Sequence, residues 1–429
     1  MRVLVCDDIE DSGRELIGQI EDAGQKIDVS HRLDKELKDA LEALFERVES
    51  CLGDLGDPKK YRAGKKLVFD DVDVVILDNN LAHLNIKGTR LTAESIAGYV
   101  RAFTGAPYVI SLNKNPNVDF DLRYLVGDYA THADLALNTK HLSNRALWTG
   151  NSADAADGFL PWYWPCLNTV AGRRREQIAF VKAHLDKPVF SSLDIPKTAY
   201  GFLSLHARGA LYPLAEADGG RNPDSKPLET VTFRDVFLAR DRSFPVEDDR
   251  KSLDDVANDE ISTIMSRVVA ADIDLWFRRD VLGPQEALVD VPHLLARMPF
   301  LLGKHSSDIK EWQKTIRTNA APFGLDPELY GKHLAKTKFK HDMWVSSPAL
   351  WWAELKGDEK LDALFFEVKQ EEWPDAVFCE DKSIFVERLP KNGAPPTEFS
   401  AEFEGSWGRR YVAKIEHTRY VPLSRFAVL

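Results

Sequence analysis

The sequence predicts an amino-terminal α/β domain built on a parallel sheet, followed by a mainly helical α+β region with a small β-rich end. In residues 1–148, short apolar runs alternate with segments of helical periodicity, which is typical of parallel strands joined by helices. After residue 173 the periodic segments are mainly helical, and after residue 376 strand-like runs replace them. A chain of 429 residues is long enough for two or three domains.

The elements of residues 1–148 follow one another in regular alternation. Continuous apolar runs such as 72–77 predict buried strands, because a strand inside a parallel sheet is covered on both faces. The predicted strands are residues 2–6, 26–30, 72–77, 108–112 and 133–137. Between them, apolar residues recur at the spacing that places them on one face of a helix. The predicted helices are residues 10–23, 34–52, 91–103 and 120–126.

Residues 149–172 are predicted to connect the two parts of the chain. Residues 150–158 are rich in small and polar residues. Residues 160–166 place three aromatic residues between two prolines, which we interpret as an interdomain anchor that buries its rings.

Residues 173–429 form the predicted C-terminal region, which we expect to be an effector or interaction region. A helical part over 173–340 and an α/β cap over 341–429 are one way to divide it. Its predicted helices are residues 176–185, 256–275, 291–301 and 308–318. Its predicted strands are residues 376–379, 384–387, 410–415 and 419–423, the first two forming a hairpin.

The charge balance and the apolar runs limit the function classes. The net charge of −12 argues against a binder of duplex DNA, which needs a dense basic surface. No apolar run reaches the length of about 18 residues that a membrane span requires. The four cysteines are isolated from one another, as expected in a reducing compartment. We therefore expect a cytoplasmic protein that binds neither DNA nor membranes.

Three aspartates follow two of the predicted strands directly. Asp7 and Asp8 come after the strand at 2–6, and Asp78 comes after the strand at 72–77. If these strands are neighbours, the three carboxylates converge, because the carboxyl ends of parallel strands share one edge of the sheet. Such a cluster repels itself unless a cation is present, and hard oxygen ligands suit Mg²⁺.

Two further polar residues follow the last strands of the predicted sheet. The fourth strand ends near Ser111, and the fifth is followed by Lys140. A hydroxyl and an ammonium group therefore join the same edge of the sheet as the carboxylates. These are the groups needed to phosphorylate a carboxylate: Asp78 as nucleophile, with Mg²⁺, Lys140 and Ser111 stabilising charge on the equatorial oxygens.

On these residues, the first 148 positions resemble the receiver domain of response regulators in two-component signalling, which has a flavodoxin-like fold with five parallel strands. The resemblance covers about a third of the chain and rests on four motifs: Val-Leu-Val-Cys-Asp7-Asp8, Val-Val-Ile-Leu-Asp78-Asn-Asn80, Val-Ile-Ser111 and Asn-Thr-Lys140. It implies that Asp7, Asp8, Asp78 and the backbone carbonyl of Asn80 bind Mg²⁺. It also implies that Asp78 takes the phosphoryl group from a histidine kinase or phosphotransfer protein, and that Ser111 and Lys140 contact that group.

The sequence departs from the receiver pattern in four respects. No proline occurs in 79–88, and His141 stands where a proline usually follows the lysine. Leu137 occupies the place of the usual aromatic switch residue, and the segment between Asp8 and Asp78 is longer than is common. These departures concern the surface that relays the signal rather than the phosphorylation chemistry.

The leading interpretation is therefore a signalling protein that is phosphorylated on Asp78 and binds an unknown protein partner through its C-terminal region. In a variant of this reading the domain is a phosphate sink, which drains phosphoryl groups without an output. No enzymatic activity is expected beyond the phosphorylation and dephosphorylation of Asp78. Two alternatives remain open: an effector enzyme in residues 160–429 that the receiver gates, and a pseudo-receiver that is never phosphorylated.

Overall fold

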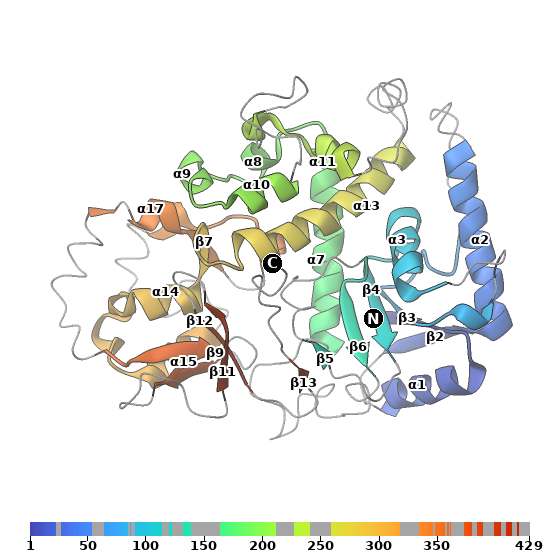
Figure 1. Cartoon of the computed structure of the whole chain (residues 1–429), viewed down its shortest axis with the longest axis horizontal. Coiled ribbons are helices and arrows are strands. Elements are labelled where there is room, and N and C mark those ends of the chain that lie inside the picture. The colour runs from blue at the N-terminus through green and yellow to red at the C-terminus, as the bar shows by residue number, and fades with distance from the viewer. Residues whose placement is uncertain are drawn as a thin grey trace, which may run out of the picture.

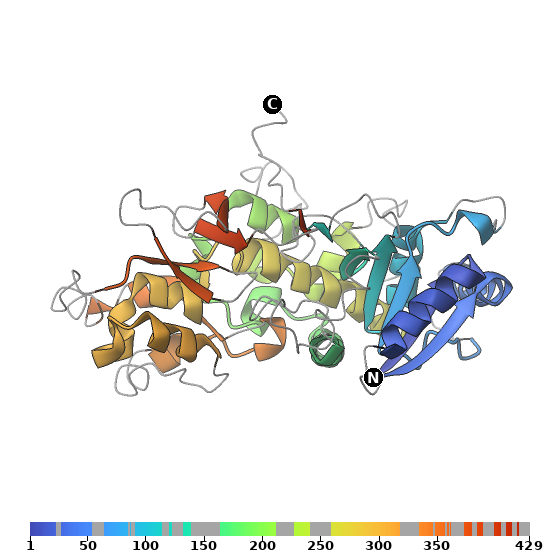
Figure 2. The ribbon, with the colours of Figure 1, turned by 90° about the horizontal axis from the view of Figure 1, so that it is seen from below.

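In the computed structural model of the chain, the parallel sheet with its helices lies at one end of the molecule and the C-terminal strands lie toward the other (Figure 1, Figure 2). The residues that the structure describes are 1–22, 27–53, 64–84, 86, 91–113, 120–121, 132–138, 164–211, 227–240, 259–317, 334–345, 348–356, 358–359, 361, 373–379, 384–388, 399–404, 409–413 and 418–419. Among the helices in these ranges, none is both long enough and apolar enough to cross a membrane.

The amino-terminal part contains the predicted parallel α/β sheet. Its strands are β1 (Arg2–Asp7), β2 (Asp28–Leu33), β3 (Val74–Asp78), β4 (Tyr108–Asn113) and β6 (Leu135–Asn138). They are ordered β2-β1-β3-β4-β6, and every neighbouring pair is parallel. All five residues of β3 are buried, which agrees with its uninterrupted apolar composition. The prediction erred most at the second strand, which lies a few residues later than 26–30.

Helices cover both faces of this sheet. The helices of this part are α1 (Glu10–Asp22), α2 (Asp34–Gly53), the short 3₁₀ turn η3 (Ala82–Leu84), α3 (Ala93–Phe103) and α7 (Trp164–Ala183). Because side chains alternate along a strand, Val3 and Val5 pack against α1, whereas Leu4 and Cys6 pack against α2 and α3. Ala171 of α7 joins the core on the α1 side.

One prediction for the middle of the chain was wrong. The helix predicted at 120–126 is not present over its first two residues, since Phe120–Asp121 is a strand, β5, that pairs in parallel with β13 (Thr418–Arg419). Strand pairing with a distant part of the chain decides the conformation there, and local periodicity does not report such a partner. Residues 149–163 of the predicted connector lie outside the described residues, and the residues from Trp164 onward belong to α7, whose Ala171 packs in the core of the sheet.

The C-terminal region is mainly helical with short strands, as predicted. Its α-helices are α8 (Val189–Ser192), α9 (Lys197–Tyr200), α10 (Leu205–Leu211), α11 (Phe233–Arg240), α13 (Asp259–Trp276), α14 (Val291–Arg297), α15 (Ile309–Arg317) and α17 (Trp352–Lys356). Shorter helical segments are η4 (Leu228–Thr230), η5 (Phe277–Val281), η6 (Pro299–His305), η8 (Ala335–Thr337) and η9 (Asp342–Trp344). The helix predicted at 291–301 is split, because Pro299 has no N–H to continue α14.

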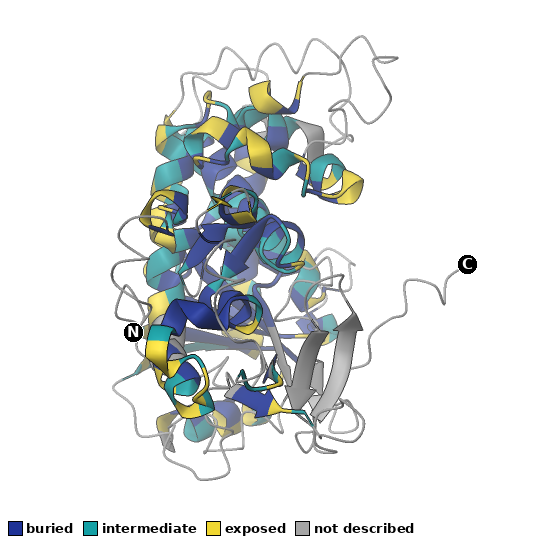
Figure 3. Ribbon diagram, turned by 90° about the vertical axis from the view of Figure 1, so that its left-hand side faces the viewer, coloured by how far each residue is buried: buried dark blue, intermediate teal, exposed yellow. Residues whose placement is uncertain are grey.

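Apart from β13, which pairs with β5, the strands in the described part of the C-terminal region form two small sheets. β7 (Leu288–Asp290) pairs with β8 (Ala349–Trp351), and the pair is antiparallel. A second sheet has the order β10-β9-β12-β11, with strands β9 (Ala376–Cys379), β10 (Ile384–Glu387), β11 (Phe399–Glu404) and β12 (Arg409–Ala413). The predicted hairpin of β9 and β10 is confirmed. Among the described residues, buried side chains concentrate in the parallel sheet and on the inner faces of the helices (Figure 3).

Helix α13 packs against both α7 and α3 and joins the C-terminal region to the sheet (Figure 1). A buried set of charged side chains lies at this junction, which we call the Arg174 network. Asp134, just before β6, forms ion pairs with Arg101 of α3 and Arg174 of α7, at 2.9 and 3.1 Å. Arg174 also pairs with Asp274 of α13 at 3.2 Å, and Gln177 donates to Asp274 at 2.8 Å. Side chains from α3 and α7 thus meet at the buried carboxylate of Asp134, and Arg174 links this carboxylate to Asp274 of α13.

A second, partly buried ion pair joins α2 to the segment before β3. Arg47 donates to both carboxylate oxygens of Asp70, each at 2.9 Å, and to the backbone carbonyls of Lys65 and Phe103. The backbone N–H of Gly105 donates to Asp70 as well. Burial alone would raise the pKa of Asp70, but these hydrogen bonds and the charge of Arg47 lower it below its ordinary value.

The stability of the protein is expected to fall when the solution is acidified. Burial alone would also raise the pKa of Asp134, but Arg101 and Arg174 lower it. Because folding lowers both pKa values, the unfolded chain binds more protons, so stability present above the unfolded pKa of about 3.9 is lost as the pH falls through the folded values. Urea unfolding measured from about pH 6 to pH 3 should show this loss. The variant Asp70→Asn should lose less stability over that range, and an equal loss would contradict the assignment.

Candidate functional site

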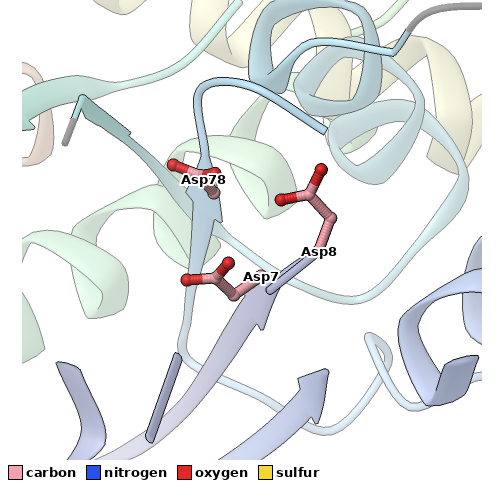
Figure 4. A group of neighbouring side chains, drawn as sticks. All are labelled: Asp7, Asp8 and Asp78. Atoms are coloured by element: carbon pink, nitrogen blue, oxygen red, sulfur yellow. The ribbon is translucent and has the colours of Figure 1, made fainter. Parts of the chain in front are cut away.

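The structure brings Asp7, Asp8 and Asp78 together at one edge of the parallel sheet (Figure 4). Asp7 ends β1, Asp78 ends β3, and these two strands are neighbours with Cys6 in register with Leu77. One carboxylate oxygen from each aspartate lies within 4.8 Å of the others. All three residues are buried, with at most 6% of their surface exposed. The predicted convergence of the three carboxylates is therefore present in the structure.

The backbone around the strand ends orients two of these carboxylates. Oδ1 of Asp7 accepts the N–H of Ile9 at 2.9 Å, and Oδ2 of Asp8 accepts the N–H of His83 in η3, also at 2.9 Å. The second oxygen of Asp8, Oδ1, is buried and has no hydrogen-bond partner among the described residues. An acceptor buried in this way costs free energy unless a ligand satisfies it.

Helix α1 approaches the strand ends closely because Gly13 has no side chain. A Cβ atom at this position would lie 2.3 Å from Cδ2 of Leu33 and 3.1 Å from Cβ of Asp7. The first of these distances is far shorter than a van der Waals contact, so a side chain at this position would have to displace Leu33. Gly13 thus lets α1 cover Asp7, which contributes to the burial of the carboxylates.

The donor set fits a hard divalent cation. Three carboxylates in one buried cluster repel one another, and burial strengthens this repulsion because the local dielectric constant is low. A cation offsets the repulsion, and oxygen ligands from carboxylates favour Mg²⁺ or Ca²⁺ over softer metals. The unpartnered Oδ1 of Asp8 is an observation of the structure that agrees with a ligand at this place.

Asn80 lies in the loop that leaves β3, where it forms an isolated bridge with Thr92. On either side of it, the carbonyl of Asn79 and the N–H of Leu81 are hydrogen-bonded to the 91–93 segment, each at 3.2 Å. In this antiparallel pattern the carbonyl of the residue between them points away from that segment. The direction is compatible with the predicted role of the Asn80 carbonyl as a metal ligand, which stays a prediction.

Ser111 is close to the strand ends, but the structure does not join it to the carboxylate cluster. In the pairing of β3 with β4, Ser111 is in register with Leu77, and Leu112 is in register with Asp78. Side chains that are in register point to the same face, so Ser111 and Asp78 belong to opposite faces of the sheet. The hydroxyl of Ser111 donates to Oδ1 of Asn79 at 3.4 Å. Direct contact of Ser111 with a phosphoryl group stays a prediction.

Lys140 and His141 lie outside the described residues, so the predicted role of Lys140 is untested. β6 ends at Asn138 and is parallel to β4, so the chain leaves the sheet at the edge where the carboxylates lie.

Three features near the carboxylates were not predicted from the sequence: Asn79, Gly13 and the backbone of His83. The sequence could have indicated Asn79, because it is a polar residue that directly follows a candidate acceptor aspartate at a strand end.

No family model, curated protein or solved structure matches this chain. The function therefore has to be argued from the site itself.

Proposed function

We propose that residues 1–148 form a receiver-like domain in which Asp78 accepts a phosphoryl group in the presence of Mg²⁺. The observation that carries this proposal is the buried cluster of Asp7, Asp8 and Asp78 at the carboxyl ends of adjacent strands. The strand order β2-β1-β3-β4-β6 supports it, because this is the order of flavodoxin-like sheets, which bind ligands at the carboxyl edge. The donor would be a histidine kinase or a phosphotransfer protein.

The residues of the site would divide the chemistry between them. A carboxylate oxygen of Asp78 attacks phosphorus, the bond from phosphorus to the donor breaks, and an acyl phosphate remains on Asp78. Mg²⁺, when bound, offsets the charge that gathers on the phosphoryl oxygens. Asp7 and Asp8 would hold the cation, with the Asn80 carbonyl as a further ligand. Lys140 would contribute a positive charge from the other side.

The C-terminal region would act as a protein-interaction or output region, and a phosphate sink is the variant without output. Its close packing with the sheet through α7 and α13 supports a region that responds to the state of the domain rather than an independent unit. Leu137 in place of an aromatic switch residue favours the phosphate sink. An effector enzyme in residues 160–429 stays a prediction.

Incubation with Mg²⁺ and acetyl phosphate, followed by intact mass spectrometry, tests the proposal. The wild-type protein should gain the mass of one phosphoryl group, and the adduct should require Mg²⁺. The variant Asp78→Asn should gain none, because its side chain cannot form the acyl phosphate. A matched control is Asp11→Asn on α1, which changes an exposed aspartate close to the site and should keep the adduct.

Beryllofluoride provides a second measurement that does not depend on phosphoryl transfer. With Mg²⁺ it forms a complex that imitates a phosphorylated carboxylate, so it should raise the melting temperature of the wild-type protein but not that of Asp78→Asn. If the wild-type protein gains no mass and shows no change in melting temperature, the domain is a pseudo-receiver and the proposal is wrong.

A further inference from the structure

The backbone of the short turn η3 is hydrogen-bonded to one of the three clustered carboxylates. The N–H of His83 donates to Oδ2 of Asp8 at 2.9 Å. Asp8 directly follows β1, and η3 lies in the loop that leaves the neighbouring strand β3, so this bond joins the ends of two adjacent strands. A hydrogen bond to an ionised carboxylate is stronger than one between neutral groups. A candidate metal ligand and η3 are therefore held to each other.

Two further hydrogen bonds of the same loop are internal to it and are longer. The N–H of Leu84 donates to the carbonyl of Leu81 at 3.3 Å. The N–H of Ala82 donates to Oδ1 of Asn80, also at 3.3 Å. Neither of them reaches the end of β1. The bond to the carboxylate is thus the shorter and stronger contact, and it is the one that ties η3 to the cluster.

The carboxylate that accepts this bond is in an unfavourable place as long as no cation is bound. Asp8 is 5% exposed, and its Oδ1 is buried without a hydrogen-bond partner among the described residues. The carboxylates of Asp7 and Asp78 lie close by and repel it. A cation bound to the cluster offsets this repulsion and offers the buried oxygen a partner. It therefore favours the orientation of Asp8 in which the His83 N–H is accepted.

We infer that the hydrogen bond between the His83 N–H and Asp8 couples η3 to the metal site. Binding of Mg²⁺ holds η3 in place, and η3 in turn strengthens the binding of Mg²⁺ by the same factor, because such a coupling is reciprocal. Hydrogen bonds to a metal-binding carboxylate change metal affinity by about 10- to 100-fold. His83 is then a positioning residue that acts through its backbone, and its exposed side chain is not needed. This inference rests on the Mg²⁺ site of the proposed function.

Hydrogen exchange in the wild-type protein tests the effect of the metal on η3. Exchange of the His83 amide is followed by mass spectrometry of overlapping peptides, in MgCl₂ and in NaCl of equal ionic strength. MgCl₂ should slow this exchange about 10-fold or more, because the amide exchanges only while its bond to Asp8 is open. The matched control is the amide of Gly105, which donates to Asp70 and should be slowed less.

A pair of substitutions at one position tests the effect of η3 on the metal. His83→Pro removes the N–H, whereas His83→Ala keeps it and changes only the exposed side chain. The Kd for Mg²⁺, obtained from melting temperatures over a range of MgCl₂ concentrations, should rise about 10- to 100-fold in His83→Pro and stay at the wild-type value in His83→Ala. The melting temperature without metal shows whether each variant is folded. Should proline prevent folding, the exchange measurement decides alone, because it needs no variant.

The inference is overturned if MgCl₂ raises the melting temperature of the wild type but slows the His83 amide no more than the Gly105 amide. A folded His83→Pro that binds Mg²⁺ as tightly as His83→Ala overturns it as well. A wild type that does not bind Mg²⁺ overturns both the metal site of the proposed function and this inference. A wild type that binds Mg²⁺ but gains no phosphoryl group contradicts the phosphorylation of Asp78 alone, so the two failures are distinguished.

Discussion

Replacing Arg174 with methionine should lower the free energy of unfolding by about 3–5 kcal/mol, the usual cost of removing one partner from a buried ion pair. The side chain of Arg174 is 4% exposed and lies between Asp134 and Asp274, whose side chains are 3% and 16% exposed. Without it, Asp134 keeps its ion pair with Arg101 at 2.9 Å, and Asp274 keeps its ion pair with Arg278 at 3.1 Å. Methionine fills much of the volume of the arginine side chain. The loss of stability therefore measures the removal of the charge rather than the creation of a cavity.

Urea unfolding measures this difference, and the chain offers a matched control. Arg14 forms an ion pair with Glu10 on the surface of α1, with 61% and 56% of the two side chains exposed. Water and salt screen such a pair, so Arg14→Met should change the free energy of unfolding by less than about 1 kcal/mol. A loss for Arg174→Met as small as that of Arg14→Met would show that the Arg174 network contributes little to the junction.

Replacing Asp8 with asparagine should remove most of the binding of Mg²⁺ and, at the same time, raise the melting temperature of the metal-free protein. Asp8 has one buried oxygen without a partner and two carboxylates close by. Removal of its charge takes away a ligand of the cation and also relieves the repulsion within the cluster. A ligand present at 100 times its Kd stabilises a protein by about 2.7 kcal/mol, and Asp8→Asn should lose most of that gain.

The measurement is a series of melting curves for the wild type and Asp8→Asn with increasing concentrations of MgCl₂. NaCl of equal ionic strength controls for screening. Asp11→Asn serves as the matched variant, because Asp11 is an exposed carboxylate of α1. A wild type whose melting temperature responds equally to MgCl₂ and NaCl would contradict a specific site. A metal-free Asp8→Asn that melts below the wild type would contradict repulsion among the carboxylates.

Much of the site follows from local patterns that a sequence displays directly. The short apolar runs at 2–6 and 72–77 predict buried strands, and their polar ends place Asp7, Asp8 and Asp78 at a sheet edge. The register of β4 against β3, in contrast, does not follow from local sequence patterns. A shift of one residue exchanges the faces of the whole strand, and the sequence 108–113 does not show which of Ser111 and Leu112 lies beside Asp78.

The sequence by itself determined the parallel α/β start, the three converging carboxylates and the mainly helical region that follows. These features depend on short-range periodicity and on the general rule that parallel strands end at a common edge. The tertiary structure alone decided that β5 pairs with β13, that α7 begins inside the expected connector, and that Arg174 joins Asp134 to Asp274. The physical reason is that each of these contacts is formed between residues far apart in the chain, whose partners no local pattern specifies. Asp7, Asp8 and Asp78 were therefore found from the ends of their strands, whereas Gly13 and the backbone of His83 were found only from the packing.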